Sequence, residues 1–434
     1  MYSSGVSALT RRTKAQVSKS RLIALFIVLL AAGALASCTE SDVEPIRVGV
    51  LHSLTGTMAI SESPVVDAIL LAIDELNEAG GLLGRQIEPV VVDARSDPAY
   101  SAEEAERLIL EEKVAAIFGC WTSACRKSVR PVVEEHNSLL FYPVQFEGLE
   151  ESPNIAYLGA TPNQQILPAV EWAFKSLGQR FFLVGSDYVF PRAANEIVKD
   201  HLARLGAEVA GEEYVLLGDT DFESVVGRIL DSKPDIILNT VNGDSNIAFF
   251  RALRQAGITT GQIPTLSFSI AEAELQGITL AHAVGDYAAW NYFQSLDTST
   301  NQDFVNRFKS KYGDNRVTDD PIEAAYTGVH LWADAVEAAG TIETEQVRGQ
   351  LANRRYSAPQ GWIRVDSNNQ HLWKYIRVGQ IREDGQFNIV WESNVDMRPE
   401  PFPGSRSQDE WQAFLDDLYL GWNQSWVNPG ETPQ

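Results

Sequence analysis

Short apolar runs alternate with longer amphipathic segments from the middle of the first hundred residues to beyond residue 260. The runs are too short for helices, and runs of this length are typical of buried strands. They predict strands at residues 46–51, 89–93, 114–119, 139–142, 180–185, 208–216, 235–240 and 264–267. The segments between them place apolar residues at helical spacing and predict helices at residues 64–79, 98–110, 123–136, 164–177, 193–205, 222–231 and 245–256.

This alternation predicts parallel sheets covered by helices, the doubly wound α/β arrangement. The pattern restarts after residue 160, so we expect two α/β lobes joined by a hinge as a clamshell. Further helices at 301–312 and 321–339 precede predicted strands at 362–365, 371–378 and 387–391. We assign residues 46–160 and 290–360 to lobe 1 and residues 161–289 and 361–400 to lobe 2. Residues 401–434, with one helical stretch at 408–420, form a C-terminal extension.

The first 37 residues differ from the rest in charge. They carry five of the 35 Lys and Arg residues and none of the 58 Asp and Glu residues, so the formal charge of −23 becomes −28 for the remaining chain. An uncharged run at 22–37 would span about 24 Å as a helix, short of the roughly 30 Å hydrocarbon core. We interpret 1–37 as a signal peptide and 38–45 as a tether. The acidic remainder argues against a nucleic-acid partner.

The end of this run, Leu35-Ala36-Ser37-Cys38, resembles a bacterial lipobox. That resemblance implies a lipoprotein signal peptide, lipidation of Cys38 and a periplasmic protein held at a membrane. The alternatives are a plain signal peptide cut nearby and twin-arginine export through Arg11 and Arg12.

The chemistry of an enzyme or a metal site is not evident. Gly-x-Ser-x-Gly is absent, and the six histidines lack His-x-x-x-His or His-Glu-x-x-His spacing. We therefore expect no catalytic residue, no metal and no cofactor. For Cys120 and Cys125 we expect unpaired thiols, because their short separation crosses a strand-to-helix turn; a disulfide in an oxidising compartment is the alternative.

In open α/β sheets, ligands lie beyond the carboxyl ends of the strands, so the strand-to-helix loops are the informative segments. A Ser-Leu-Thr-Gly loop at 53–56, a Gly-Gly-x-x-Gly turn at 80–84 and Asp-x-x-Ser-Asp-Pro at 93–98 occur in that order. The chain thereby resembles the type I periplasmic solute-binding proteins of the branched-chain amino-acid and amide class. The loops at 119–124, 141–148, 185–191, 239–243, 267–272 and 288–293 narrow the resemblance to the urea and short-chain amide branch of ABC transporters. Cys125 and Phe146 depart from that pattern, where we expect Ser and Tyr.

Urea has one acceptor oxygen and four N–H donors, and a buried site must match most of them, because an unmatched polar group costs about 1–3 kcal/mol. We expect hydroxyl, amide and aromatic side chains of the loops to do so. The candidate ligand-binding residues are Trp121, Thr122, Ser123, Tyr142, Gln145, Tyr188, Asn242 and Glu272. Structural alternatives are core aromatics for Trp121 and Tyr142, hinge packing for Tyr188, a helix cap for Ser123, and turn or surface positions for Asn242 and Glu272.

The resemblance implies a binding protein that captures urea or a short-chain amide by lobe closure and delivers it to the permease subunits of an ABC transporter. A branched-chain or other amino acid is the alternative ligand, with Glu272 or Asp187 as partner for its ammonium group. An amide-sensing receptor is a further alternative.

Overall fold

The computed structural model describes residues 44–430. The expected signal peptide, the lipidation site Cys38 and most of the tether lie outside the described residues. Within 44–430, the model contains no helix with the length and apolar character needed to cross a membrane.

One parallel five-stranded sheet has the strand order β2-β1-β3-β4-β5. Its strands are β1 Ile46–His52, β2 Ile87–Asp93, β3 Ile117–Gly119, β4 Leu140–Tyr142 and β5 Ile155–Tyr157. The central strands β3 and β4 are buried along their whole length, as expected for strands that are covered on both faces. The helices packed around this sheet are α2 Ala59–Glu78, α3 Pro98–Leu110, α4 Ser123–Glu135, α11 Asp320–Ala339 and α12 Thr344–Leu351.

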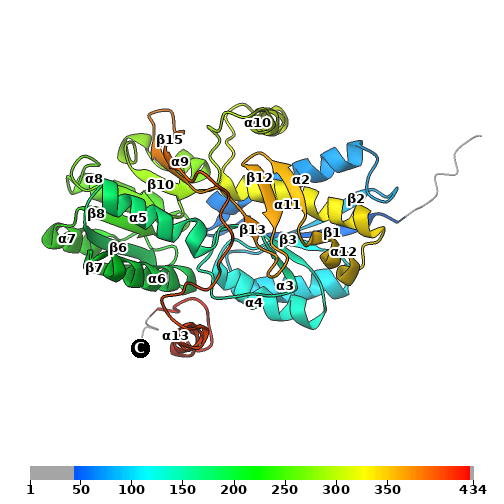
Figure 1. Ribbon diagram of the computed structural model, residues 1–434, viewed down its shortest axis with the longest axis horizontal. Helices are drawn as coiled ribbons and strands as arrows, with labels where there is room; N and C mark the ends of the chain where they lie inside the picture. Colours follow the sequence, from blue (N-terminus) through cyan, green and yellow to red (C-terminus); the bar gives the residue numbers. More distant parts are fainter. Residues whose placement is uncertain (1–43, 431–434) are drawn as a thin grey trace, which may run out of the picture. The chain divides into compact units, whose positions relative to one another are not determined.

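The second sheet has seven strands in the order β15-β14-β10-β9-β8-β6-β7. Its parallel part consists of β6 Arg180–Ser186, β7 Glu208–Val215, β8 Ile236–Thr240, β9 Thr265–Ser267 and β10 Tyr287–Trp290. The antiparallel strands β14 Arg377–Ile381 and β15 Phe387–Glu392 extend it at one edge. Its helices are α5 Ile166–Ser176, α6 Val189–Leu205, α7 Glu223–Ser232, α8 Ser245–Gln255 and α9 Glu272–Gly277. Figure 1 shows the two sheets with helices on their faces.

A small antiparallel sheet lies next in the chain. It is formed by β11 Arg355–Ala358, β12 Gly361–Val365 and β13 Leu372–Trp373. Ile363, Val365 and Leu372 pack into the hydrophobic core of the first sheet, although we expected residues from 361 onward in lobe 2. The single strand expected at 371–378 is also wrong, because β13 and β14 belong to different sheets.

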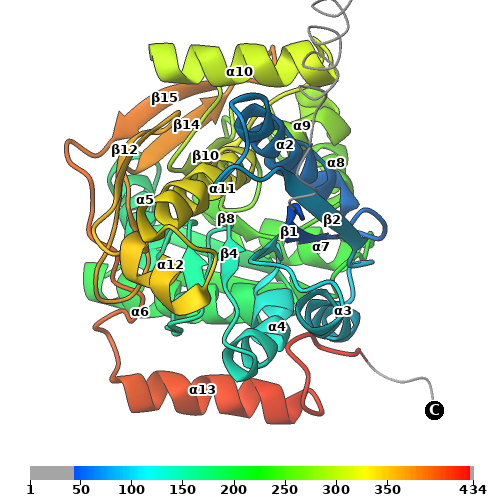
Figure 2. The same ribbon diagram turned by 90° about the vertical axis from the view of Figure 1, so that its right-hand side faces the viewer.

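The chain crosses several times between the two cores. Helix α10 Ser299–Tyr312 and helix α11 pack in the first core through Phe304, Phe308 and Trp332. The chain then returns to the second sheet through β14, and α13 Gln408–Gly421 follows. Trp411 of α13 is buried in the second core, and Figure 2 shows α13 running below α6. The part of the expected C-terminal extension described here is therefore packed onto lobe 2.

Candidate functional site

The loop after β3 and the first turn of α4 carry three of the candidate residues. Thr122 is the N-cap of α4, and its side-chain oxygen accepts a hydrogen bond from the N–H of Cys125 at 3.1 Å. Ser123 and Ala124 occupy the first two helical positions, where a backbone N–H has no carbonyl partner within the helix. Trp121 and Ser123 are almost completely buried. The sequence thus places two unpaired N–H donors and a hydroxyl at the carboxyl end of a central strand.

A disulfide between Cys120 and Cys125 spans this loop. The expected unpaired thiols are therefore a wrong prediction. Cys120 lies in the left-handed region, with φ of 64°, and the two Cα atoms are 5.5 Å apart, within the range that a disulfide can join. The bond encloses residues 121–124, so it fixes the loop that carries Ser123.

The hydroxyl of Ser123 is held by two charged side chains. It donates a hydrogen bond to Oε2 of Glu147 and accepts one from Nη1 of Arg126 at 3.0 Å. All three side chains are buried. The hydroxyl proton is therefore used inside the protein, and only an oxygen lone pair remains for a ligand.

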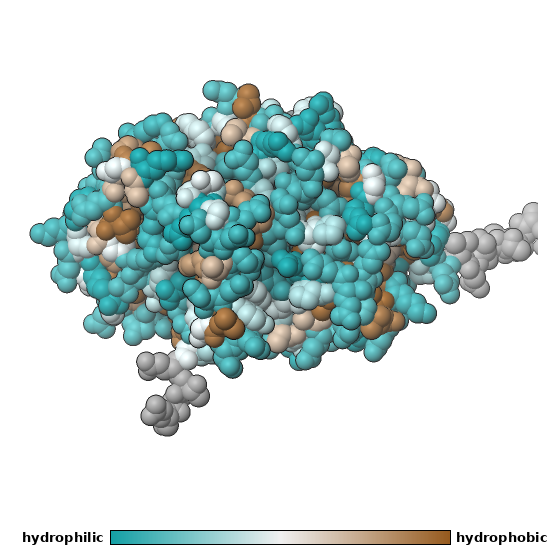
Figure 3. Space-filling model, turned by 60° about the horizontal axis from the view of Figure 1, so that its bottom comes forward, coloured by the Kyte–Doolittle hydropathy of each residue, from teal (hydrophilic) through white to brown (hydrophobic). Residues whose placement is uncertain are grey.

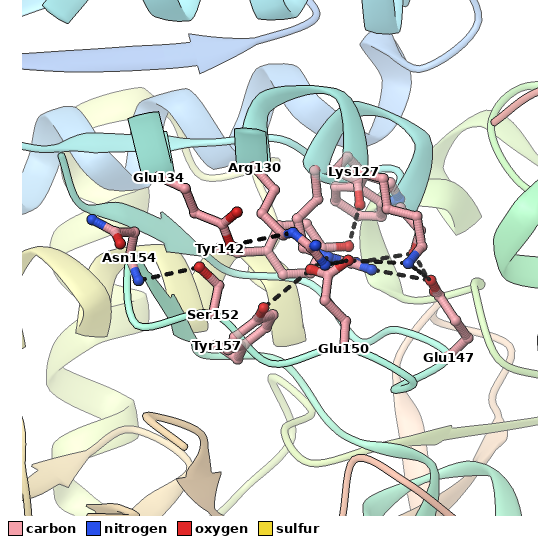
Figure 4. Close-up of polar contacts among 12 residues, drawn as sticks. Lys127, Arg130, Glu134, Tyr142, Glu147, Glu150, Ser152, Asn154 and Tyr157 are labelled. Carbon is pink, nitrogen blue, oxygen red and sulfur yellow. Dashed lines mark hydrogen bonds and ion pairs between the residues drawn. The ribbon is translucent and has the colours of Figure 1, made fainter. Parts of the chain in front are cut away.

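Arg126, Lys127, Glu147 and Glu150 form a buried group of ion pairs, which we call the Arg126 network (Figure 4). Arg126 donates from Nη2 to Glu147 at 3.0 Å and from Nε to Glu150 at 2.9 Å. Lys127 Nζ lies 3.0 Å from Oε2 of Glu150.

The electrostatics of this network favour the charged forms. Burial alone would raise the pKa of Glu150, but the opposing charges of Arg126 and Lys127 hold that pKa far below its usual value. Burial likewise opposes the charge of Arg126, and Glu150 and Glu147 nevertheless raise its pKa well above the usual value. The buried carboxylates of the network are each paired with cations, and Arg130 lies 3.5 Å from Glu150 at its edge.

Tyr142, at the end of β4, lies beside this network. Its hydroxyl donates to the carbonyl oxygen of Trp121 at 2.6 Å, and Arg126 lies 4.8 Å from the centre of its ring. Burial raises the pKa of the hydroxyl, so it stays protonated. Like Ser123, Tyr142 has already used its proton within the protein. Phe146 also packs on Arg126, with its ring centre 4.5 Å from the guanidinium carbon.

Gln145 and Tyr188 connect the two lobes at this site. Nε2 of Gln145 donates to the carbonyl oxygen of Phe268, just after β9, at 2.8 Å. Oε1 of Gln145 is buried and has no protein partner among the described residues. Tyr188 follows β6 and is buried, which raises the pKa of its hydroxyl; Tyr142 and Glu147 are close enough to raise it further. The structure therefore brings Ser123, Tyr142 and Tyr188 around one region.

Asn242 and Glu272 do not join this group through the contacts described. Asn242 stabilises its own turn: its N–H donates to Ser186 Oγ at 3.0 Å and its side chain donates to the carbonyl oxygen of Thr240 at 3.0 Å. Glu272 accepts the N–H of Gln294 at 2.7 Å, and its other oxygen has no partner among the described residues.

Glu272 belongs to a second buried group with Glu274, Asp319 and Asp320, which we call the acidic cluster. Burial raises the pKa of Glu272 to about 8, and the charges of Glu274 and Asp320 add to the shift. Burial, with Glu274 and Glu272 nearby, also raises the pKa of Asp319 well above its usual value. No group of side chains among residues 44–430 is arranged to hold a metal ion.

The two lobes touch across the site. Thr57, after β1, bonds through its hydroxyl to Asp244, whose N–H donates back to the Thr57 carbonyl at 3.2 Å. Ser61 of α2 donates to Glu274 of α9 at 2.6 Å. These bonds join opposite lobes, so the structure corresponds to a closed form.

Comparison with known proteins identifies the class. The family described as "Periplasmic binding protein domain" matches residues 46–408, and the chain belongs to this family. Leu/Ile/Val-binding protein homolog 6 of Brucella melitensis is 24% identical over 388 residues, which cover 86% of this chain and 95% of that protein. The crystal structure of an ABC-transporter solute-binding protein from R. palustris in complex with 4-hydroxybenzoate has a TM-score of 0.74 at 23% identity, covering 82% of this chain and 98% of that one.

A shorter match is 33% identical over 120 residues to limonene hydroxylase of Geobacillus stearothermophilus. It covers 28% of this chain and 22% of that protein, so the chain spans less than a quarter of that enzyme. The full-length relatives are substrate-binding proteins and not enzymes. The chain is accordingly a periplasmic binding protein with a two-lobed α/β fold, the fold that it shares with a solute-binding protein of an ABC transporter.

Proposed function

We propose that the protein captures urea, or a short-chain amide, between its lobes and delivers it to the permease of an ABC transporter. One observation carries the choice of ligand: the hydroxyl protons of Ser123 and Tyr142 are both donated to protein acceptors. Each hydroxyl can therefore offer a ligand only an oxygen lone pair. Such a surface selects a ligand that is rich in N–H donors.

The remaining groups complement the rest of a urea molecule. Oε1 of Gln145 is a buried acceptor without a protein partner, and an N–H of the ligand would satisfy it. The N–H groups of Ser123 and Ala124 point from a helix N-terminus, which favours the partial negative charge of a carbonyl oxygen. These groups would pair the urea oxygen and up to three of its four N–H donors with groups of the opposite kind.

The same geometry disfavours ligands that carry a carboxylate, the group shared by amino acids and aromatic acids. Arg126 and Lys127 are the cations nearest Ser123 in the contacts described, and both are paired with Glu147 and Glu150. A ligand carboxylate at Ser123 would approach Glu147 without a free cation to balance it.

The expected partners for the ammonium group of an amino acid are also occupied. Asp187 is bonded to Arg192 at 2.7 Å and to Asn428 at 2.6 Å. Glu272 belongs to the acidic cluster, where its raised pKa favours the neutral acid. Neither residue offers an amino acid a free anion next to Ser123.

Isothermal titration calorimetry of the purified protein with urea, acetamide, leucine and 4-hydroxybenzoate tests this proposal. About 1.5 kcal/mol for each of the four heavy atoms of urea limits Kd to roughly 40 μM, which sets the protein concentration needed. We expect saturable binding of urea and weaker or no binding of the two carboxylates. Tighter binding of leucine or 4-hydroxybenzoate than of urea would refute the choice of ligand.

We further propose that Cys38 is lipidated and that the tether holds the protein at the membrane on the periplasmic side. The family places the protein outside the cytoplasm, and the lipobox-like sequence supports the anchor. The test is Cys38→Ser, which should release the protein from the membrane fraction. Equal membrane retention of both forms would contradict lipidation at this residue.

A further inference from the structure

The segment after α13 touches both lobes beside the candidate site. The family match ends at residue 408, so residues 409–430 lie beyond the shared domain. This segment does not point away from the protein. It returns from α13 and pairs with the loop that carries Tyr188.

On lobe 2, the contact is made by the backbone. The N–H of Val189 donates to the carbonyl oxygen of Trp426 at 3.0 Å, and the N–H of Asn428 donates to the carbonyl oxygen of Asp187 at 3.1 Å. The Asn428 side chain adds a hydrogen bond to Oδ2 of Asp187 at 2.6 Å. These bonds hold the residues on both sides of Tyr188.

On lobe 1, the contact is made by one aromatic ring. Nζ of Lys127 lies 5.0 Å from the centre of the Trp426 ring, within the range of a cation–π interaction. Lys127 is itself part of the Arg126 network that holds Ser123 (Figure 4). Tyr419 of α13 packs against the same Trp426 ring, with the two ring centres 4.5 Å apart.

We propose that Trp426 and Asn428 are positioning residues for the ligand site: Asn428 fixes the Tyr188 loop, and Trp426 ties that loop to Lys127 of the opposite lobe when the lobes are closed. This proposal deepens the proposed function and rests on it for the choice of urea as probe. Residues 426–428 thus connect the Tyr188 loop of lobe 2 to Lys127 of lobe 1, which belongs to the network around Ser123. The segment stabilises the closed form, so its loss should speed release of the ligand.

Two graded pairs of variants of the full-length protein test this assignment. Asn428→Ala removes the side-chain bond to Asp187, and Asn428→Pro also removes the backbone N–H. Trp426→Leu removes the ring over Lys127, and Trp426→Phe keeps a ring there. Trp362→Ala is the matched control, because Trp362 is 64% exposed on β12.

We expect Kd for urea to rise about threefold to tenfold in N428A and more in N428P. The Kd for urea should also rise in W426L. In W426F it should stay closer to the wild-type value, and in W362A it should equal the wild-type value. The melting temperature without urea should stay close to that of the wild type in N428A. Unchanged Kd in N428P and W426L would overturn the proposal.

A measurement without ligand separates the two proposals. Hydrogen–deuterium exchange of residues 187–190 should become faster in N428A and N428P and remain unchanged in W362A. If the wild type does not bind urea but this exchange still responds, the ligand assignment fails and the positioning role stands. If the exchange is the same in all proteins, the positioning role is wrong, whatever the ligand.

Discussion

Two buried groups of charged side chains, the Arg126 network and the acidic cluster, lie in the same molecule and behave in opposite ways. Both are shielded from water. In the Arg126 network, nearby cations hold the pKa of Glu150 below its usual value. In the acidic cluster, burial and the nearby carboxylates raise the pKa of Glu272 to about 8.

The difference shows that the charge of a buried carboxyl group depends on its neighbours as well as on burial. Burial disfavours the ionised form in both places, and a hydrogen-bonded cation reverses the result in one of them. The charged group next to Ser123 is the one with matched partners. The protein can therefore orient the Ser123 hydroxyl with full charges that are paired with one another.

The largest expected effect comes from removing the central cation of the Arg126 network. Arg126→Met leaves Glu147 and Glu150 buried without their main partner, and such a loss costs about 3–5 kcal/mol of unfolding free energy. Chemical denaturation followed by circular dichroism measures it. Adding Glu147→Gln and Glu150→Gln to R126M should restore part of the stability. A loss below about 1 kcal/mol in R126M would show that the network is not charged as described.

A smaller effect is expected from the acidic cluster, and it depends on pH. Glu272 has a pKa raised above its unfolded value, so the protonated folded form is favoured and its contribution to stability is lost as pH rises through about 8. Glu272→Gln cannot ionise and should lose less stability on alkalinisation. Between about pH 6 and about pH 9, the stability of the wild type should fall by about 2–3 kcal/mol more than that of E272Q. Parallel pH profiles would contradict a buried neutral acid at this position.

Binding should respond to the hydroxyls that the Arg126 network orients. Ser123→Ala and Tyr142→Phe each remove an acceptor that the ligand would use, and we expect Kd for urea to rise several-fold, at a cost of about 1 kcal/mol. Titration calorimetry gives Kd. The melting temperature without ligand should fall in both variants, because each leaves a buried protein acceptor without its hydroxyl donor. Ser232→Ala is a matched control, because Ser232 ends α7 and its hydroxyl donates to its own helix. Equal Kd in all four proteins would remove Ser123 and Tyr142 from the site.

The smallest effect is expected from an ion pair on the surface. Arg47 bonds to Glu112 at 3.0 Å, but its side chain is 44% exposed. Arg47→Met should change the unfolding free energy by less than about 1 kcal/mol, because solvent screens the pair. The difference between the losses of unfolding free energy in R126M and in R47M measures how much burial contributes to the cost of breaking an ion pair. A cost similar to that of R126M would contradict the comparison.

The sequence predicted the buried parallel strands correctly, but it predicted one strand at 371–378 where the structure has two strands in different sheets. Strands such as β3 and β8 are buried on both faces, and their uninterrupted apolar runs predicted them. The segment 371–378 has apolar residues at strand-like positions, yet the chain leaves one sheet and enters another between Trp373 and Arg377. A local pattern does not record which sheet a strand joins.

Position in the fold was enough to choose Ser123 and Tyr142 as candidates for the site. Ser123 follows β3 and Tyr142 ends β4, both at the carboxyl edge of the first sheet. Glu147 and Glu150 were missed as parts of the site, since an isolated charge in a sequence ordinarily indicates the surface. Their partner Arg126 is more than twenty residues away, and only the fold brings it close. The disulfide was missed for a related reason, because it depends on the left-handed backbone at Cys120.

The placement of charge inside and outside the protein has a consequence for the conditions under which it works. The exterior carries most of a strongly acidic composition, and Figure 3 shows a largely hydrophilic face with scattered hydrophobic positions. Those outer charges are exposed to the ionic strength of the medium, whereas the buried charges of the Arg126 network are screened far less. A periplasmic protein meets changes in salinity that the cytoplasm does not. Its affinity for the proposed neutral ligand should therefore stay nearly constant from low to high salt.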